Sequence, residues 1–270
     1  LPQAHVGRRT ALYDYHVNDD MTVLVGCGLG GTSLINANVA LRPDERVFDD
    51  ERWPEAFRQD VGGRLEEGYR RAEEMLRPAP YPQDFPELPK LEALRKSAEA
   101  MDATFYRLPI NVTFEDGVNH VGVEQRACKL CGDCAAGCNH HAKNTTLMNY
   151  LPDAHNHGAE IYTCVSVRTI ERKDGRWLVH YQVLDAGQET FDAPLATVSA
   201  DLLIVAAGCL GSSEILLRSK AEGLSLSDRV GDFFSGNGDV GGGAYNADVE
   251  IRSIGFGAVS YTHLTLPTNR

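Results

Sequence analysis

The alternation of apolar and polar positions near the start of the chain predicts a strand, a tight turn and a helix. Residues 21–25 form a short β-branched run, residues 26–31 contain four glycines, and residues 32–41 can form a helix. Apolar residues then recur at helical spacing over residues 53–75, and a second amphipathic helix is expected over residues 91–101. Five prolines between these two stretches predict an extended connection.

The second half of the chain reads mainly as strands. Asp174-Gly175 is a strong hairpin signal between two of them, and residues 201–208 form a continuous apolar run that ends at glycine. Such a run is typical of a strand buried on both faces of a parallel sheet, and a helix is expected over residues 212–219. The fold class predicted is α/β, a parallel sheet with helices plus an antiparallel β portion; the expected antiparallel strands are 160–165, 167–172 and 177–184.

Composition narrows the possible partners. The chain has 270 residues, of which 43% are hydrophobic, enough for a sizeable core, and a formal net charge of -12. That charge argues against nucleic acid as a partner, and no apolar run approaches the roughly 20 residues of a membrane span. We expect a cytoplasmic protein; export stays open because the chain begins with Leu rather than Met, so that a targeting sequence would precede it.

The glycine-rich turn has three interpretations when taken alone. Gly26, Gly28 and Gly31 fit G-x-G-x-x-G after a strand, the pattern in which backbone approaches a pyrophosphate. The same glycines are compatible with a turn needed only for tight packing. An NAD-binding dehydrogenase would need an acidic residue about 20 positions further on, at the end of a second strand. Asp49 and Asp50 lie near that distance, but no strand is expected before them.

Three ordered segments resemble one enzyme family. Residues 30–38, GGTSLINAN, resemble the family pattern GGGS-x-x-N; residues 206–218 resemble its strand-turn-helix signature; residues 236–239, after Phe234, resemble a segment found near the cofactor. The chain is thereby identified as a member of the glucose-methanol-choline (GMC) family of flavin-dependent oxidoreductases, near its cholesterol-oxidase-like branch. The resemblance covers about residues 13–243.

The resemblance implies FAD as cofactor and a CH-OH group of a bulky alcohol, a sterol in this branch, as substrate. A base would take the hydroxyl proton while hydride passes to the flavin, and electrons would leave to oxygen or a redox carrier. The family's catalytic residues lie in its C-terminal part, so none is named here. Backbone near Val167 would hold adenine, and the full set of implied FAD contacts is Gly28, Gly30, Gly31, Asn36, Val39, Val167, Gly208, Asn237 and Gly238.

The four clustered cysteines have the spacing of a ferredoxin-type motif. Cys128-x2-Cys131-x2-Cys134-x3-Cys138 matches the bacterial [4Fe-4S] run, although Asn139 stands where proline usually follows. A structural zinc site, with His140 or His141 contributing, is a second interpretation. A third is free or disulfide-paired cysteines that brace the loop locally. An iron-sulfur electron-transfer module therefore remains an alternative function, beside the NAD-dependent dehydrogenase.

The expected organisation treats the chain as an internal fragment that holds half of a flavin site. Residues 259–270 resemble translated sequencing-adapter DNA and are expected to be non-native. The predicted segments are 1–77 and 146–236 as parts of the FAD-binding domain, 78–127 as an insert or part of the substrate domain, 128–145 as the cysteine motif, 237–258 as the start of the substrate-binding domain, and 259–270 as the tail.

Overall fold

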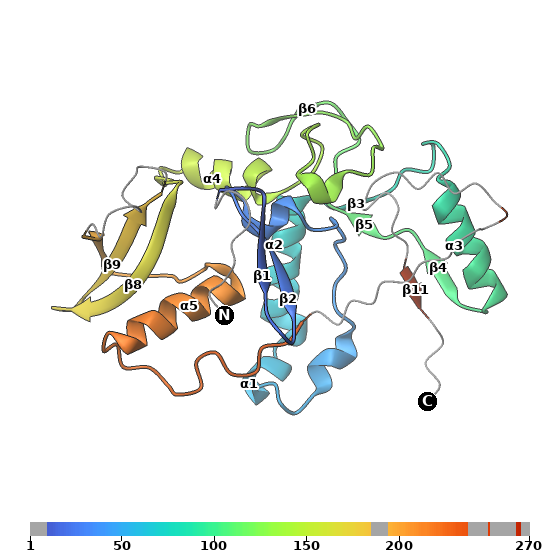
Figure 1. Ribbon diagram of the computed structural model, residues 1–270. Helices are drawn as coiled ribbons and strands as arrows, with labels where there is room; N and C mark the ends of the chain where they lie inside the picture. The colour runs from blue at the N-terminus through green and yellow to red at the C-terminus, as the bar shows by residue number, and fades with distance from the viewer. Residues whose placement is uncertain (1–9, 185–193, 237–247, 249–262, 266–270) are drawn as a thin grey trace. The chain divides into compact units, whose positions relative to one another are not determined.

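The computed structural model describes residues 10–184, 194–236, 248 and 263–265. The chain divides into two compact units, Leu1–Ile161 with Asn246–Arg270, and Tyr162–Tyr245. Each unit has its own core, and each is described here by itself (Figure 1). Within the described residues, no helix combines the length and the apolar character needed to cross a bilayer.

The first unit opens with an antiparallel hairpin. β1 (Tyr13–Val17) pairs with β2 (Thr22–Gly26), which confirms the strand predicted over residues 21–25. The helix predicted over residues 32–41 is wrong: only a short 3-10 helix, η1 (Gly31–Leu34), forms there. The chain cannot continue as a helix because Asn38 adopts a left-handed conformation, with φ of 64°.

The helical pattern over residues 53–75 is confirmed, with an interruption. Arg70 donates hydrogen bonds to Glu67 on the exposed face of the last helix of this stretch, as expected for an amphipathic surface helix. The predicted second amphipathic helix is also present. In chain order the elements are η2 (Glu45–Asp49), α1 (Glu55–Arg58), η3 (a π-helix, Val61–Leu65), α2 (Glu66–Leu76) and α3 (Pro89–Ala100).

Three chain segments lie side by side in the core of the first unit. Val39 forms an antiparallel bridge with Ile110, and Val112 forms one with Lys143. Backbone hydrogen bonds extend these bridges from Asn38 to residue 144. The adjacent apolar cluster consists of Tyr81, Ile110, Val112 and Ala142, with Phe85 and Phe114 packed on it.

Short elements surround this core. The smaller strands pair as β3 with β5, β6 with β7, and β4 with β11, all antiparallel. Residues 263–265, inside the segment expected to be non-native, supply β11; the rest of that segment lies outside the described residues. The bounds are β3 (Ala79–Pro80), β4 (Thr104–Tyr106), β5 (Pro109–Ile110), β6 (Gly117–Val118), β7 (Glu124–Gln125), η4 (Cys134–Ala136), η5 (Thr146–Met148), α4 (Tyr150–Asn156) and β11 (His263–Thr265).

The second unit is a three-stranded antiparallel sheet with one helix alongside it (Figure 1). The order is β10-β9-β8, and the predicted Asp174-Gly175 turn joins β8 and β9 with both residues at positive φ, as a tight hairpin turn requires. The helix buries Ile215 against this sheet. The bounds are β8 (Val165–Lys173), β9 (Arg176–Val183), β10 (Ala196–Ala200) and α5 (Gly208–Ala221).

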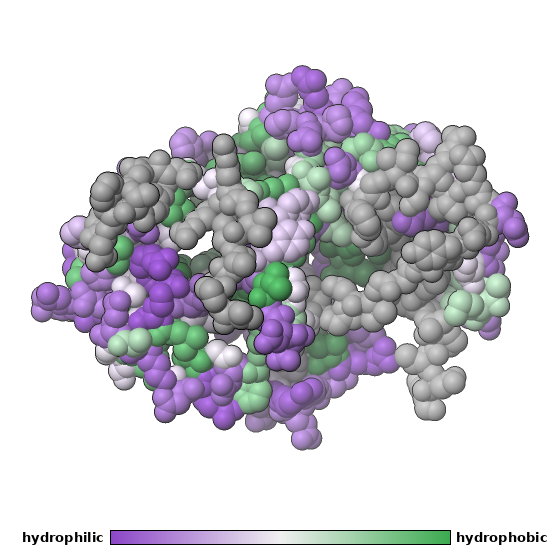
Figure 2. Space-filling view, in the orientation of Figure 1, coloured by the Kyte–Doolittle hydropathy of each residue, from purple (hydrophilic) through white to green (hydrophobic). Residues whose placement is uncertain are grey.

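Two strand predictions in this unit are wrong. Residues 160–164 are not a strand, and β8 begins only at Val165, directly after Cys164, which is left-handed with φ of 54°. Residues 201–207 form no strand either, and Leu202 and Ile204 are each 78% exposed. All strand pairs among the described residues are antiparallel, so the parallel sheet is not found there. Figure 2 shows hydrophilic residues spread over the drawn face with smaller apolar areas between them.

Candidate functional site

The glycines of the turn after β2 have two different structural roles. Gly26 is buried, and a Cβ there would lie 2.6 Å from the carbonyl oxygen of Gly31 and 2.6 Å from the Cα of Thr32. Gly26 is therefore required for close packing of the turn against itself. Gly28, Gly30 and Gly31 instead have φ of 124°, 119° and 55°, values that favour glycine.

Gly31 faces open space. A Cβ built on it meets no atom within 4 Å, whereas one on Gly30 would meet the side chain of Leu34. Asn36 is exposed on the same loop, and Val39 is partly exposed while its backbone is bridged to Ile110. The backbone at Gly31 is thus open to close approach by a ligand, and the exposed Asn36 offers an amide nearby in sequence.

The side chain of Lys143 forms hydrogen bonds to the backbone of this loop. Its side chain is only 2% exposed, and its ammonium donates three hydrogen bonds, to the carbonyl oxygens of Leu34 at 2.9 Å, Asn36 at 2.8 Å and Cys134 at 2.9 Å. A lysine ammonium has three N–H donors, so all three are used. Among the described residues no carboxylate lies within ion-pair distance of it.

Burial changes the acidity of this lysine. Desolvation lowers the pKa of Lys143 from its usual 10.5 to about 8, an effect that the nearby Cys134 and Cys138 partly oppose. Carbonyl acceptors compensate the buried charge by hydrogen bonding rather than by ion pairing.

Thr146 forms hydrogen bonds to the other end of the loop, at Gly30 and Ser33. Its hydroxyl donates to the carbonyl oxygen of Gly30 at 3.2 Å, and its backbone N–H donates to the hydroxyl of Ser33 at 3.1 Å. The hydroxyl of Ser33 donates in turn to the carbonyl oxygen of Gly30 at 2.6 Å. Residues 143–146, called the bracket below, therefore hold the glycine turn at both of its ends.

The structure does not support the predicted metal site. The four cysteines all lie in the described part of the chain, and no group of three or more His, Cys, Asp or Glu in that part is placed to hold a metal ion. Cys128 and Cys138 pack against the apolar cluster around Ile110, and Cys134 is buried. Burial raises the pKa of Cys128 to about 11. Cys131 is also a free thiol, so the interpretation that fits is local bracing without disulfides.

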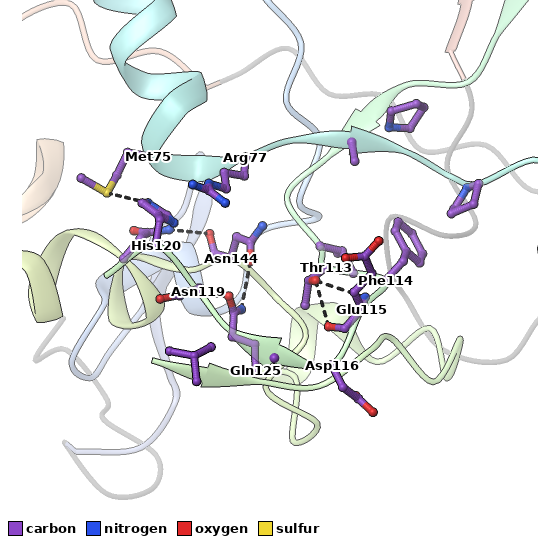
Figure 3. A pocket seen from close by; sticks show the side chains of 17 residues that line it. Met75, Arg77, Thr113, Phe114, Glu115, Asp116, Asn119, His120, Gln125 and Asn144 are labelled. Atoms are coloured by element: carbon purple, nitrogen blue, oxygen red, sulfur yellow. Dashed lines mark hydrogen bonds between the residues drawn. The ribbon is translucent and has the colours of Figure 1, made fainter. Parts of the chain in front are cut away.

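A cleft of about 420 Å³ lies between the end of α2 and residues 112–149 (Figure 3). Its floor is a chain of amides: Asn119 donates to Gln125 at 3.0 Å, Gln125 donates to Asn144 at 3.0 Å, and Asn144 donates to the carbonyl oxygen of Leu76 at 2.9 Å. At its rim His120 contacts the sulfur of Met75 at 3.4 Å, and burial lowers the pKa of that histidine. These contacts connect the end of α2 to residues 119–125 and 144, so the polar side chains on the floor of the cleft are engaged in holding the fold together.

The second unit contains two of the predicted FAD contacts near one apolar hollow. Val167 lines a hollow of about 310 Å³ together with residues 203–207, which lead directly to Gly208. Gly208 begins α5 with φ of 72°, and a Cβ there would meet nothing within 4 Å. The carbonyl oxygen of Val167 already accepts a hydrogen bond from Arg218 at 3.4 Å. Asn237 and Gly238 lie outside the described residues.

Comparison with known proteins agrees with this geometry. The family model described as GMC oxidoreductase matches residues 9–232. The chain belongs to the GMC oxidoreductase family. It is 29% identical to a cholesterol oxidase of Mycobacterium tuberculosis over 94% of this chain and 46% of that protein, and 28% identical to a cholesterol oxidase of Acinetobacter baumannii over 89% and 46%.

A further relative belongs to the same family but has no named substrate. An uncharacterized GMC-type oxidoreductase of M. tuberculosis is 28% identical over 77% of this chain and 29% of that protein. The chain thus spans about half the length of the cholesterol oxidases that it matches. In this GMC chain the matched region includes the glycine turn, the cysteine loop and α5.

Sequence reasoning missed the part that Lys143 plays. Lys143 lies in the segment predicted as the cysteine motif, residues 128–145, and two of its contacts reach residues 109 and 107 positions away. A lysine beside a polar Asn and Thr has no local signal of burial, because lysine is normally exposed.

Proposed function

We propose that this chain is part of an FAD-dependent oxidoreductase that oxidises the CH-OH group of a bulky alcohol. The observation that carries the proposal is the glycine turn of a GMC chain, with Gly31 at positive φ and facing open space. When bound, the flavin would supply the hydride acceptor. The turn would supply backbone that a large planar cofactor can approach closely, with Asn36 as a polar contact.

The hollow in the second unit gives separate support. An adenine ring is flat and largely apolar on its faces, and the residues that line the hollow with Val167 are Ile, Leu, Val and Ala. Gly208 follows directly with an open position for a Cβ. We therefore propose Val167 and Gly208 as contacts of the FAD nucleotide.

We propose a sterol as the substrate, because two of the similar proteins are cholesterol oxidases. Oxygen or a redox carrier would take the electrons. The protein expressed from its complete gene should carry a visible flavin spectrum after purification, and the flavin should be bleached by a sterol under anaerobic conditions but not by ethanol. A purified, folded protein without flavin that takes up none on titration would refute the proposal; bleaching by ethanol alone would refute only the choice of substrate.

A further inference from the structure

We propose that Lys143 is a positioning residue for the flavin site, which holds the carbonyl groups of Leu34 and Asn36 and so fixes the loop that presents Gly31 to the cofactor. The inference rests on the proposed function, because it assigns a role within the same site. It concerns a buried lysine to which membership of the family assigns no role.

Lys143 is buried without a carboxylate partner among the described residues. A buried charge usually has a counter-ion, but Lys143 is 2% exposed and its ammonium donates to three backbone carbonyls. An apolar side chain of the same length would fill this space without the cost of desolvating an ammonium. The charge is therefore used to hold carbonyl groups in place, and hydrogen bonds from a charged donor are roughly twice as strong as neutral ones.

Lys143 also restrains the backbone at Asn36. Asn36 is exposed, yet its own carbonyl oxygen is fixed on Lys143 at 2.8 Å. Holding the carbonyl limits rotation of the backbone on either side of Asn36. The side-chain oxygen of Asn36 accepts a hydrogen bond from the backbone N–H of Asn38 at 3.3 Å, so the ammonium fixes the backbone from which this side chain projects.

Lys143 acts together with Thr146. The bracket fixes the carbonyl of Gly30 at one end of the turn and those of Leu34 and Asn36 at the other. Gly31 lies between the two points of attachment. A turn built on left-handed glycines has little rigidity of its own, so external contacts must define its shape.

The third carbonyl that Lys143 holds, that of Cys134, belongs to the cysteine loop. Cys134 accepts from the same ammonium at 2.9 Å, while Cys128 and Cys138 pack against the apolar cluster. The cysteine loop is thereby connected through Lys143 to the turn that is proposed to face FAD. The loop would then support the cofactor site through this hydrogen bond.

The test uses the protein expressed from its complete gene and compares Lys143→Met with Lys143→Arg. Methionine retains length and apolar volume but has no donors, whereas arginine retains the charge with a different shape. The matched control is Lys129→Met, an exposed lysine in the same cysteine loop. The measurements are FAD affinity of the apoprotein, the visible circular dichroism of bound flavin, and the unfolding midpoint.

We expect Lys143→Met to weaken FAD binding about tenfold or more and to change the circular dichroism of bound flavin, with partial recovery in Lys143→Arg and no change in Lys129→Met. A lysine that served only fold stability would lower the unfolding midpoint and leave the flavin signal of the folded variant unchanged, which would overturn the proposal. If wild type itself binds no FAD, the proposed function fails first.

A variant that does not fold needs a second route. If Lys143→Met is unfolded, Thr146→Val decides together with Lys143→Arg, because the valine removes one of the two hydroxyls that donate to the carbonyl of Gly30 and leaves that of Ser33 in place. A loss of FAD affinity of about threefold or more in folded Thr146→Val supports the bracket. Affinities within twofold of wild type in both variants overturn it.

Discussion

Gly26 and Gly31 lie five positions apart in one turn, and replacing each by alanine should separate packing from binding. In Gly26→Ala the new Cβ would be 2.6 Å from both the carbonyl oxygen of Gly31 and the Cα of Thr32, and 2.9 Å from the carbonyl carbon of Gly31. Ordinary carbon contacts are about 3.5–4.0 Å, so the turn must move by roughly 1 Å. These atoms belong to the backbone and cannot rotate away as a side chain could.

The expected cost follows from that overlap. Overpacking of this kind costs about 1–3 kcal/mol, and we expect Gly26→Ala near the upper end because only backbone can give way. Gly31→Ala meets no atom within 4 Å, but its φ of 55° makes a side chain cost about 1–2 kcal/mol. The Cβ of that alanine would occupy space proposed for the flavin, so its FAD affinity should fall further than its stability does.

The assay is urea unfolding of the apoprotein together with FAD titration, with Gly62→Ala as control. Gly62 has open space around its Cβ position and no positive φ, so alanine there should be neutral or stabilise by about 0.5–1 kcal/mol. The reasoning would be wrong if Gly26→Ala unfolds within about 0.5 kcal/mol of wild type, since a smaller effect would mean that the turn is not packed as described.

Two further predictions test the cysteine loop and the core. Because burial raises the pKa of Cys128 from 9.0 to about 11, its thiolate fraction near neutral pH should be about 100-fold below that of an ordinary thiol, and mass spectrometry should find it alkylated well after the exposed Cys164 and Cys209. The pKa of Cys128 is higher in the folded than in the unfolded protein. The contribution of this thiol to stability is therefore constant below about pH 9 and is lost between about pH 9 and 11. Stoichiometric iron or zinc in the purified protein would contradict the free-thiol interpretation. Ile110→Ala should lower the free energy of unfolding by about 3 kcal/mol, against less than about 0.5 kcal/mol for Val118→Ala on the surface, and equal effects in urea unfolding would contradict the assigned core.

Local elements were predictable from the sequence where a local pattern determines them. The Asp174-Gly175 turn needs two residues that tolerate positive φ, and the sequence supplies them between two strand patterns. The apolar periodicity of residues 53–75 likewise leads to α2. The helix expected after the glycine turn failed because Asn38 leaves the helical region, which no apolar spacing reports. Cys164 ended a predicted strand in the same way.

The candidate site could be predicted only in part, since its residues were recognised by resemblance while their support is long-range. Gly26 and Gly31 look alike in sequence, yet one meets backbone at 2.6 Å and the other meets nothing. The difference depends on how the turn folds back over itself. The predicted metal site is not supported for a related reason: spacing gives the reach of the cysteines, but Cys128 and Cys138 pack against the apolar cluster around Ile110.

Lys143 connects the glycine turn to the cysteine loop. If its ammonium fixes the carbonyls of Leu34 and Asn36, then any change that moves the cysteine loop should also disturb the glycine turn, because the carbonyl of Cys134 shares the same donor group. Two of these three hydrogen bonds join positions more than a hundred residues apart, so local contacts alone do not account for the conformation of the glycine turn. The conformation of the proposed cofactor site then depends on one buried lysine as much as on its glycines.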